Sequence, residues 1–363
     1  MLRAKPHIES IVPVTHGGIS YANLAEKGVS AGNVLDFSIC CNPHGPPKKV
    51  YTALRKINIE LYPDPDSSQL IKALSSRMNV LPENLIAASG STEVIRLTAL
   101  AYFDQGDTVI ITSPTYGEYE LGCRLSKARI EKYAIPESAD FQLNASNFIS
   151  FAKKHKLAGI FLCNPNNPTG QYLSSKDVRL LASSFPDTLI ALDEAYIAFT
   201  DKAWDSLQLL SAPNVLIIRS MTKDFALAGL RLGYGIASKR LIDNLKKARP
   251  PWNVNSAAQQ AGLAVLGCTD YLENCIARIH SCKLYLAAQF TALGYKVIPS
   301  STNYFLVRVG NAAKLKGRLL NRGFLVRDCT SFGLPDYIRV APRKMQDCRS
   351  LINSIKALAG EKG

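Results

Sequence analysis

From about residue 84, short apolar runs alternate along the chain with stretches in which apolar residues recur at helical spacing. The runs are rich in Ile, Val and Leu and polar at their ends, so we predict buried β-strands at 84–89, 108–112, 159–163, 189–192 and 215–219. The helical patterns lie near 92–103, 116–125, 144–155 and 174–184. This alternation predicts an α/β fold with a mostly parallel sheet covered by helices on both faces. Ligands of such sheets bind where the strands end.

The pattern changes after residue 255. A long helical stretch from about 255 to 293 precedes short strands near 295–298, 303–308 and 337–341, with helices near 312–321 and 344–358. This mixture predicts a smaller α+β domain, whereas the first 45 residues are irregular and rich in Gly and Pro turns. We therefore divide the chain into an N-terminal arm with a small-domain segment (1–45), a large domain (46–255), and a connecting helix with the C-terminal small domain (256–363).

Composition places the chain among soluble globular proteins, with 47% hydrophobic and 20% charged residues in 363. No apolar run approaches the roughly 18–20 residues that cross a bilayer, and the N-terminal MLRAKPHIES lacks an apolar core. The nine cysteines include no CxxC pair, so neither a metal site nor a dithiol is indicated. We therefore expect a cytoplasmic protein with reduced thiols, no metal and no membrane partner.

The formal net charge of +14 has two interpretations, a nucleic-acid surface or a site that attracts small anions. The basic residues are scattered in short groups such as Lys48–Lys49, Lys153–Lys154 and Lys246–Lys247. No RNA-binding aromatic motif or zinc-finger spacing accompanies them. We therefore expect no nucleic-acid partner, and we interpret part of the charge as attraction of anionic substrates.

The most informative segment begins at the end of the strand predicted at 215–219 and contains Ser220, Thr222, Lys223 and Arg231. A lysine among apolar and hydroxyl residues can be desolvated, which lowers its pKa and frees the amine for Schiff-base chemistry. The planar guanidinium of Arg231 suits a phosphate. The alternative is a surface lysine at a helix start, but that would not account for the hydroxyl residues and the arginine around it.

A second strand ends at Asp193, followed by Tyr196, and a third is followed by Asn167 in a turn with two prolines and a glycine. An acid at the end of a buried strand is costly unless it meets a cation, and a protonated pyridine nitrogen would supply one. Tyr196 and Asn167 could reach a ring oxygen. Structural roles, with Asp193 as a cap and Tyr196 packed in the core, are the alternative.

The strand predicted at 84–89 passes through Gly90 into a helix that opens with Ser91 and Thr92. Free amides and hydroxyls at a helix N-terminus form a phosphate cradle, although a capping box with Glu93 would give the same residues. The next strand leads into Tyr116, which places an aromatic face at the same sheet edge or packs in the core.

Together these segments resemble the pyridoxal-phosphate enzymes of aspartate-aminotransferase type, fold type I, over about residues 15–355. The resemblance implies that Lys223 holds the cofactor and moves a proton at the substrate carbon, while Asp193 keeps the pyridine nitrogen protonated. The other residues that the resemblance assigns to the cofactor are Gly90, Ser91, Thr92, Tyr116, Asn167, Tyr196, Ser220, Thr222 and Arg231. Tyr62 resembles a tyrosine that such enzymes lend to a partner subunit, so the family implies a homodimer with shared active sites.

Within that family two subgroups compete, the histidinol-phosphate aminotransferases and the L-threonine-O-3-phosphate decarboxylases of cobalamin synthesis. Thr15–Gly18, Asn42–Gly45 and the stretch Pro251–Asn255 resemble the decarboxylases, whereas the sequences around Arg327 and Arg339 resemble both subgroups. The residues assigned to a small phosphorylated amino-acid substrate are His16, Gly17, Asn42, Asn167, Arg327 and Arg339.

The resemblance thus implies decarboxylation of O-phospho-L-threonine. Ile39-Cys40-Cys41 departs from the decarboxylase pattern, in which a polar amide is common, so O-phospho-L-serine is a second candidate substrate. The alternatives are transfer of an amino group from histidinol phosphate to 2-oxoglutarate, and a binding protein that has kept the fold without catalysis. A decarboxylase must hold the substrate carboxylate perpendicular to the cofactor plane, whereas an aminotransferase holds the Cα–H bond there.

Overall fold

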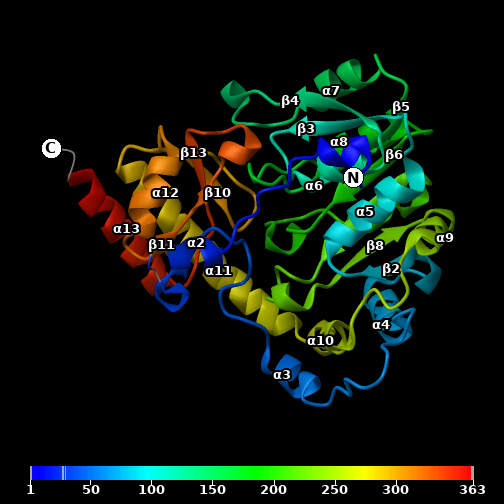
Figure 1. Ribbon diagram of the computed structural model, residues 1–363, viewed down its shortest axis with the longest axis horizontal. Coiled ribbons are helices and arrows are strands. Elements are labelled where there is room, and N and C mark those ends of the chain that lie inside the picture. The colour runs from blue at the N-terminus through cyan, green and yellow to red at the C-terminus, as the bar shows by residue number, and fades with distance from the viewer. Residues whose placement is uncertain (1, 27, 29, 361–363) are drawn as a thin grey trace.

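The computed structural model describes residues 2–26, 28 and 30–360, which form a large and a small lobe (Figure 1). The large lobe is built on a seven-stranded sheet in the order β2-β8-β7-β6-β5-β3-β4. Its strands are β2 (Leu85–Ala88), β3 (Thr108–Ser113), β4 (Arg129–Ala134), β5 (Leu157–Cys163), β6 (Leu189–Asp193), β7 (Val215–Ser220) and β8 (Gly233–Ala237). β8 runs antiparallel to both neighbours and the other pairs are parallel, which confirms the predicted mostly parallel sheet.

Helices cover both faces of this sheet. One face carries α3 (Lys48–Leu54), α4 (Ser68–Met78), α7 (Ala145–Ala152), α8 (Ser175–Ser184) and α10 (Ser256–Leu266). The other carries α5 (Ser91–Tyr102), α6 (Glu118–Leu125) and α9 (Lys239–Ala248). Alternate residues of β7 serve the two cores, with Val215 and Ile217 in the first and Leu216 and Ile218 in the second. Because both faces of the strand are buried, its sequence is a continuous apolar run.

The small lobe contains a four-stranded antiparallel sheet in the order β12-β13-β10-β9. Its strands are β9 (Lys296–Val297), β10 (Phe305–Arg308), β12 (Arg327–Asp328) and β13 (Tyr337–Val340). Its helices are α11 (Thr269–Ala292), α12 (Ala312–Leu320) and α13 (Met345–Gly360). The short strand β1 (Leu35–Asp36) pairs in parallel with β11 (Phe324–Leu325), so the chain before the large lobe also contributes to the small one.

The N-terminal segment runs between the lobes (Figure 1). α1 (Pro6–Glu9) contacts α6 of the large lobe, and the chain then crosses to α2 (Tyr21–Glu26) beside the small lobe. The remaining regular structure consists of short 3₁₀ helices at Ala31–Asn33, Pro82–Asn84, Glu137–Ala139, Ile197–Phe199, Ser206–Ser211, Ala228–Leu230 and Thr330–Phe332.

The structure differs from the predicted elements at several places, and α3, α4 and α9 were not predicted at all. The predicted helix over 255–293 is two helices, α10 and α11, because the chain leaves the helix at Gly267. Strand β4 was missed because it is an edge strand whose alternate residues are polar, and β8 because it contains two glycines. The helix predicted at 116–125 begins only at Glu118.

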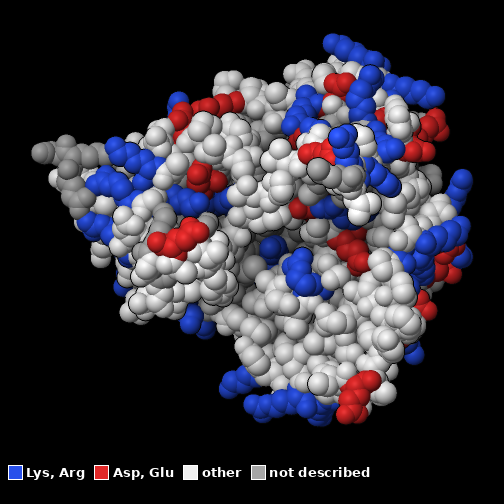
Figure 2. All heavy atoms as spheres, in the orientation of Figure 1, with Lys and Arg blue, Asp and Glu red and all other residues white. Residues whose placement is uncertain are grey.

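Two global properties bear on the expectations from composition. None of the nine cysteines, all in the described part of the chain, forms a disulfide. Among the described helices, none combines the length and the apolar character that a membrane crossing requires. Figure 2 shows Lys and Arg side chains over both lobes of one face, interspersed with acidic ones.

Gly233 offers a test of how closely β8 packs against the start of α5. A Cβ at this position would lie 2.4 Å from the backbone nitrogen of Ser91 and 2.9 Å from the carbonyl oxygen of Arg219. Because backbone atoms cannot easily move, we expect Gly233→Ala to lower the free energy of unfolding by about 1–3 kcal/mol in urea titrations. Gly317→Ala in α12, where a Cβ would meet nothing within 4 Å, is the control. Equal stability of the two variants would contradict this packing.

Candidate active site

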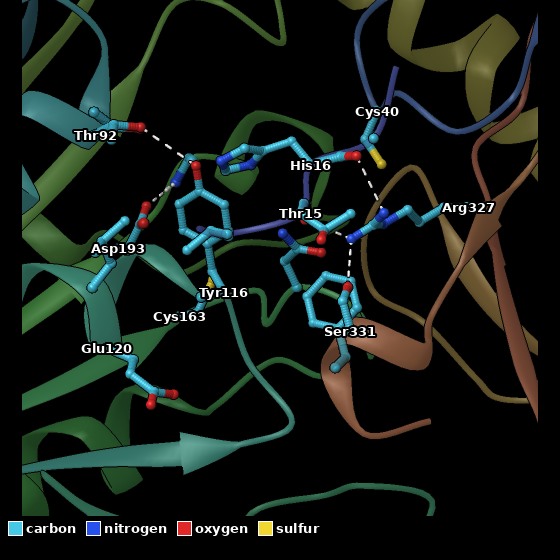
Figure 3. A pocket seen from close by; sticks show the side chains of 18 of the residues that line it. Thr15, His16, Cys40, Thr92, Tyr116, Glu120, Cys163, Asp193, Arg327 and Ser331 are labelled. Carbon is cyan, nitrogen blue, oxygen red and sulfur yellow. Dashed lines mark hydrogen bonds between the residues drawn. The ribbon is translucent and has the colours of Figure 1, made fainter. Parts of the chain in front are cut away.

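A cavity of about 510 Å³ opens between the lobes at the carboxyl ends of the parallel strands. Most of the residues singled out from the sequence line it. They are His16, Gly17, Ser91, Thr92, Tyr116, Asn167, Asp193, Tyr196, Thr222, Lys223, Arg231, Arg327 and Arg339. The large lobe supplies the strand-end residues and the small lobe supplies the two C-terminal arginines, with His16 and Gly17 entering from the N-terminal segment (Figure 3).

Four of the predicted site residues do not line the cavity, although three lie directly behind it. A Cβ at Gly90 would lie 2.7 Å from Nη2 of Arg231, and the hydroxyls of Ser220 and Thr222 are 2.7 Å apart. The N–H of Asn42 donates to the carbonyl of Lys223 at 2.8 Å, and its side-chain amide donates to the carbonyl of the next residue. These three residues therefore support the cavity wall.

Tyr62 is the fourth, and it lies apart from the cavity of its own chain. Its side chain is 78% exposed and stacks on Trp252, with ring centroids 4.4 Å apart. Ile59 and Leu61, which are close to Tyr62 in the sequence, are also exposed, as is Tyr51 on α3. Tyr62 therefore belongs to an apolar surface of the large lobe.

Asp193 lies buried at the end of β6 and accepts two hydrogen bonds. The N–H of Ala195 donates to Oδ1 at 2.9 Å, and the hydroxyl of Tyr119 donates to Oδ2 at 2.7 Å. Burial raises the pKa of Asp193 to about 6, although both hydrogen bonds act to lower it. A cation opposite this carboxylate would favour its ionised form.

The N-terminus of α5 forms one end of the cavity. Gly90 has a φ of +81°, which a side chain rarely adopts, and it leaves room for the guanidinium of Arg231. Ser91, Thr92 and Arg231 line the cavity here. The N–H groups of a helix's first turn together with an arginine make a site for a phosphate.

Tyr116 and Lys223 also line the cavity. The Tyr116 hydroxyl is 3.4 Å from Oγ1 of Thr92, and burial raises the pKa of Tyr116 to about 12, so the phenol is neutral. Lys223 follows β7, with Nζ 5.9 Å from the ring centroid of Tyr196. The Tyr196 ring meets the Tyr304 ring edge-on, with centroids 4.9 Å apart. The amine of Lys223 thus lies near the Tyr196 ring at the cavity.

The opposite end of the cavity is cationic. Arg339 donates through Nη1 to Oδ1 of Asn167 and through Nη2 to the carbonyl of Ser38 at 2.7 Å. Its Nε is buried and has no hydrogen-bond partner in the described part of the protein. A polar ligand in the cavity is a natural partner for this guanidinium.

Arg327 lies at the same end and contacts the N-terminal segment (Figure 3). Nη2 donates to the carbonyl of Thr15 at 2.6 Å and to the hydroxyl of Ser331 at 2.7 Å, while Nη1 donates to the carbonyl of His16 at 3.2 Å. Burial and the charge of Arg339 lower the pKa of Arg327. Arg327 and Arg339 are partners across the antiparallel strands β12 and β13, so their charges repel each other, and an anion between them would relieve this repulsion.

Sequence reasoning missed several residues of the site. Glu118 and Tyr119 follow Tyr116 closely, but nothing in their spacing indicates that Tyr119 reaches Asp193 or that Glu118 reaches His16. Ser38 and Cys40 line the cavity from the segment after β1. Cys40 is buried beside Tyr196 and Tyr304, and burial raises its pKa to about 11, so it presents a neutral thiol.

The site as a whole fits pyridoxal phosphate. The cradle at α5 with Arg231 suits its phosphate, the buried carboxylate of Asp193 suits its ring nitrogen, and the amine of Lys223 suits its aldehyde. A mostly parallel sheet that carries this set at its strand ends defines the class of pyridoxal-phosphate enzymes of fold type I.

Comparison with known proteins agrees with that class. The model of the family "Aminotransferase class I and II" matches residues 32–355, so the chain belongs to this family of fold type I pyridoxal-phosphate enzymes. A histidinol-phosphate aminotransferase of Symbiobacterium thermophilum is 35% identical over 325 residues, which cover 88% of this chain and 89% of the relative.

Two solved structures show the same fold at 26% identity, each covering 90% of this chain and 100% of the other. They are the histidinol-phosphate aminotransferase from Clostridium acetobutylicum, with a TM-score of 0.83, and the L-threonine-O-3-phosphate decarboxylase from Porphyromonas gingivalis, with a TM-score of 0.81. These similarities therefore support the family and the cofactor. They do not distinguish an aminotransferase from a decarboxylase, so that choice has to be argued from the site.

The hydroxyl of Tyr119 can be tested directly. Tyr119→Phe removes one of the two donors to Asp193, so the pKa of that carboxyl should rise further above about 6 and the ionised form should become rarer near neutral pH. We expect about tenfold weaker binding of pyridoxal phosphate at neutral pH, measured by absorbance titration of the cofactor-free protein, with the loss shrinking as the pH rises.

Tyr102→Phe, which removes a hydroxyl far from the cavity on the α5–α9 contact, is the matched control. Unchanged cofactor affinity in Tyr119→Phe across the pH range would show that the bond to Asp193 has no part in cofactor binding.

Proposed function

We propose that this protein is a cytoplasmic pyridoxal-phosphate-dependent decarboxylase that converts O-phospho-L-threonine to (R)-1-aminopropan-2-ol O-phosphate and CO2 for cobalamin synthesis. The observation that carries this choice is the cationic end of the cavity, where Arg327 and Arg339 are partners on the neighbouring strands β12 and β13. A short amino acid with a carboxylate and a phosphate matches two adjacent guanidinium groups. Histidinol phosphate has no carboxylate, so it would match only one of them.

At the cofactor end, Ser91, Thr92 and Arg231 would bind the phosphate of pyridoxal phosphate, and Asp193 would pair with its ring nitrogen. Tyr116 would cover the ring, Asn167 and Tyr196 would reach its oxygen, and Ser220 and Thr222 would complete the phosphate site. Gly90 leaves room for Arg231. Pyridoxal phosphate, when bound, accepts the electron pair released when a bond to the substrate α-carbon breaks.

Lys223 has two tasks in this proposal. Its amine would hold the cofactor through the cofactor's aldehyde. In decarboxylation the bond from the α-carbon to the carboxylate breaks, CO2 leaves, and a proton takes its place on the carbon. Nζ of Lys223 is the group in the cavity that we propose delivers this proton.

Arg327, Arg339, His16 and Gly17 would hold the two anionic ends of the substrate. Asn167 holds Arg339, and Asn42 holds the backbone at Lys223, so we propose that these two amides position the groups that act. The neutral thiol of Cys40 forms part of the wall in place of a polar amide, which leaves O-phospho-L-serine as a second substrate.

The second candidate is a histidinol-phosphate aminotransferase, which the name of the relative at 35% identity favours. In that reaction a proton leaves the α-carbon, and the amino group passes to 2-oxoglutarate, whose two carboxylates could also meet the two arginines.

The two reactions give different products. Purified protein loaded with pyridoxal phosphate is expected to release CO2 from O-phospho-L-threonine, and to form no glutamate from histidinol phosphate with 2-oxoglutarate. Lys223→Ala should abolish the CO2 release because the cofactor link and the proton donor are both lost. Glutamate without CO2 would establish the aminotransferase, and neither product with a loaded cofactor would point to a binding protein of the same fold.

We further propose that the protein is a homodimer in which Tyr62 of one chain serves the site of its partner. Tyr62 is exposed within an apolar surface of its own chain, and such surfaces mark contact sites between proteins. A two-fold axis would place the same surface of a second copy against it.

This sharing predicts complementation between two inactive variants. Tyr62→Ala and Lys223→Ala are each expected to have little activity alone. Random pairing after co-expression makes half of the dimers mixed, and each mixed dimer has one site with both native residues, so about a quarter of the wild-type CO2 release should return. Purified mixed dimers without activity would show that Tyr62 does not serve the partner's site.

A further inference from the structure

Glu118 is an almost buried acid that has no role in the chemistry proposed above. It lies in the first turn of α6, two residues after Tyr116, and its side chain is 5% exposed. Burying a carboxylate is costly unless each oxygen finds a donor. Here Oε2 accepts from Nε and Nη2 of Arg96 on α5 at 3.2 and 2.5 Å, and Oε1 lies 3.0 Å from Nε2 of His16.

These bonds dominate the ionisation of Glu118. Burial acts to raise the pKa of the carboxyl, but the hydrogen bonds from His16 and Arg96 outweigh it, and the pKa is lowered. Glu118 is therefore an anion. Arg96 of helix α5 binds its Oε2, and its Oε1 faces His16 in the N-terminal segment.

The N-terminal segment 14–18 is attached at both sides of the cavity. On the large lobe, Val14 packs against Gly117 so closely that a Cβ there would lie 2.9 Å from Cγ1 of Val14. On the small-lobe side, Arg327 binds the carbonyls of Thr15 and His16, and the Ser38 hydroxyl accepts from the N–H of Gly18 at 2.8 Å. The segment thus spans the cavity from one lobe to the other.

Within this segment, His16 is the residue whose side chain reaches the large lobe through a polar contact. Its ring lies 5.9 Å from the ring of Tyr116 and is half exposed, so packing alone does not fix it. Its bond to Glu118 selects one orientation of the imidazole at the edge of the cavity.

We propose that Glu118 is a positioning residue that fixes His16, and with it segment 14–18, across the cavity and thereby sets the affinity for the phosphorylated substrate. The inference rests on the proposed function in one respect, the assignment of His16 to the substrate. Glu118 itself touches neither the cofactor site nor the cationic end, so its effect on the reaction passes through His16.

The test compares Glu118→Gln, His16→Gln and the double variant, with Glu131→Gln as control. Glu131 lies on the edge strand β4 in a surface pair with Arg129 at 3.8 Å, so its loss removes a glutamate charge without touching the segment. We expect Glu118→Gln to raise KM for CO2 release from O-phospho-L-threonine about tenfold, with kcat changed less than about threefold and cofactor affinity unchanged.

The double variant shows whether Glu118 affects substrate binding through His16 or independently of it. If Glu118 acts through His16, the double variant should have about the same KM as His16→Gln alone. A KM that rises about a hundredfold, as the product of two independent effects, would overturn the inference, as would a Glu118→Gln variant with wild-type KM.

Amide hydrogen exchange without substrate provides a readout that does not depend on the reaction. Peptides covering residues 10–18 should exchange faster in Glu118→Gln than in wild type or in Glu131→Gln. If exchange is faster in Glu118→Gln but the wild-type protein releases no CO2, Glu118 still anchors the segment and the proposed function is refuted. Equal exchange in all three proteins would refute the anchoring role whatever the reaction proves to be.

Discussion

A carboxylate buried at the end of β6 is the constraint on which the rest of the site depends. Asp193 lies where a parallel strand stops, and its ionised form is costly there because burial raises its pKa to about 6. The fold offsets this cost locally, through the N–H of Ala195 and the hydroxyl of Tyr119. The Tyr119 ring is in turn held by stacking on Phe161, with centroids 5.0 Å apart. A cationic ring nitrogen of the cofactor would favour the ionised form further, which is the role that we propose for this acid.

The same sheet edge explains why residues far apart in the sequence meet. Parallel strands end on one side, so Asn167 after β5, Asp193 on β6 and Lys223 after β7 reach a common cavity. The opposite wall comes from the small lobe, where β12 and β13 carry Arg327 and Arg339. The bond from Arg339 to Asn167 joins the two walls. The two lobes therefore have different roles in our proposal. The large lobe supplies the residues that we assign to the cofactor, and the small lobe supplies the cations that we assign to the substrate.

The N-terminal segment adds a third component to the site. Its residues belong to neither core, and they are held by side chains from both lobes, Glu118 on one side and Arg327 with Ser38 on the other. A substrate entering the cavity therefore meets a wall whose position depends on hydrogen bonds rather than on a packed core. Such contacts can be remade at modest cost, so this segment is where we expect related enzymes to differ in substrate affinity.

The fold followed from sequence wherever burial imposes a simple pattern. Strands such as 215–219 are covered on both faces, so they read as unbroken apolar runs, and the predicted strand agrees with β7. The edge strand β4 is covered on fewer sides and carries polar residues, so no such pattern marks it. The break between α10 and α11 was also missed, since apolar residues continue at helical spacing across Gly267.

The sequence by itself predicted most of the residues that we assign to the cofactor, because several of them lie at or just after strand ends. Strand ends are visible in the sequence as places where an apolar run stops. Asp193 and Lys223 could be named in this way before any coordinates, and Arg231 was named from its spacing to Lys223. Only the tertiary structure decided what holds these groups, as the contacts of Tyr119 with Asp193 and of Glu118 with His16 span 74 and 102 residues. Local propensity carries no information about such distant pairs. It was the packing of α6 against the sheet and the path of the N-terminal segment that brought them together.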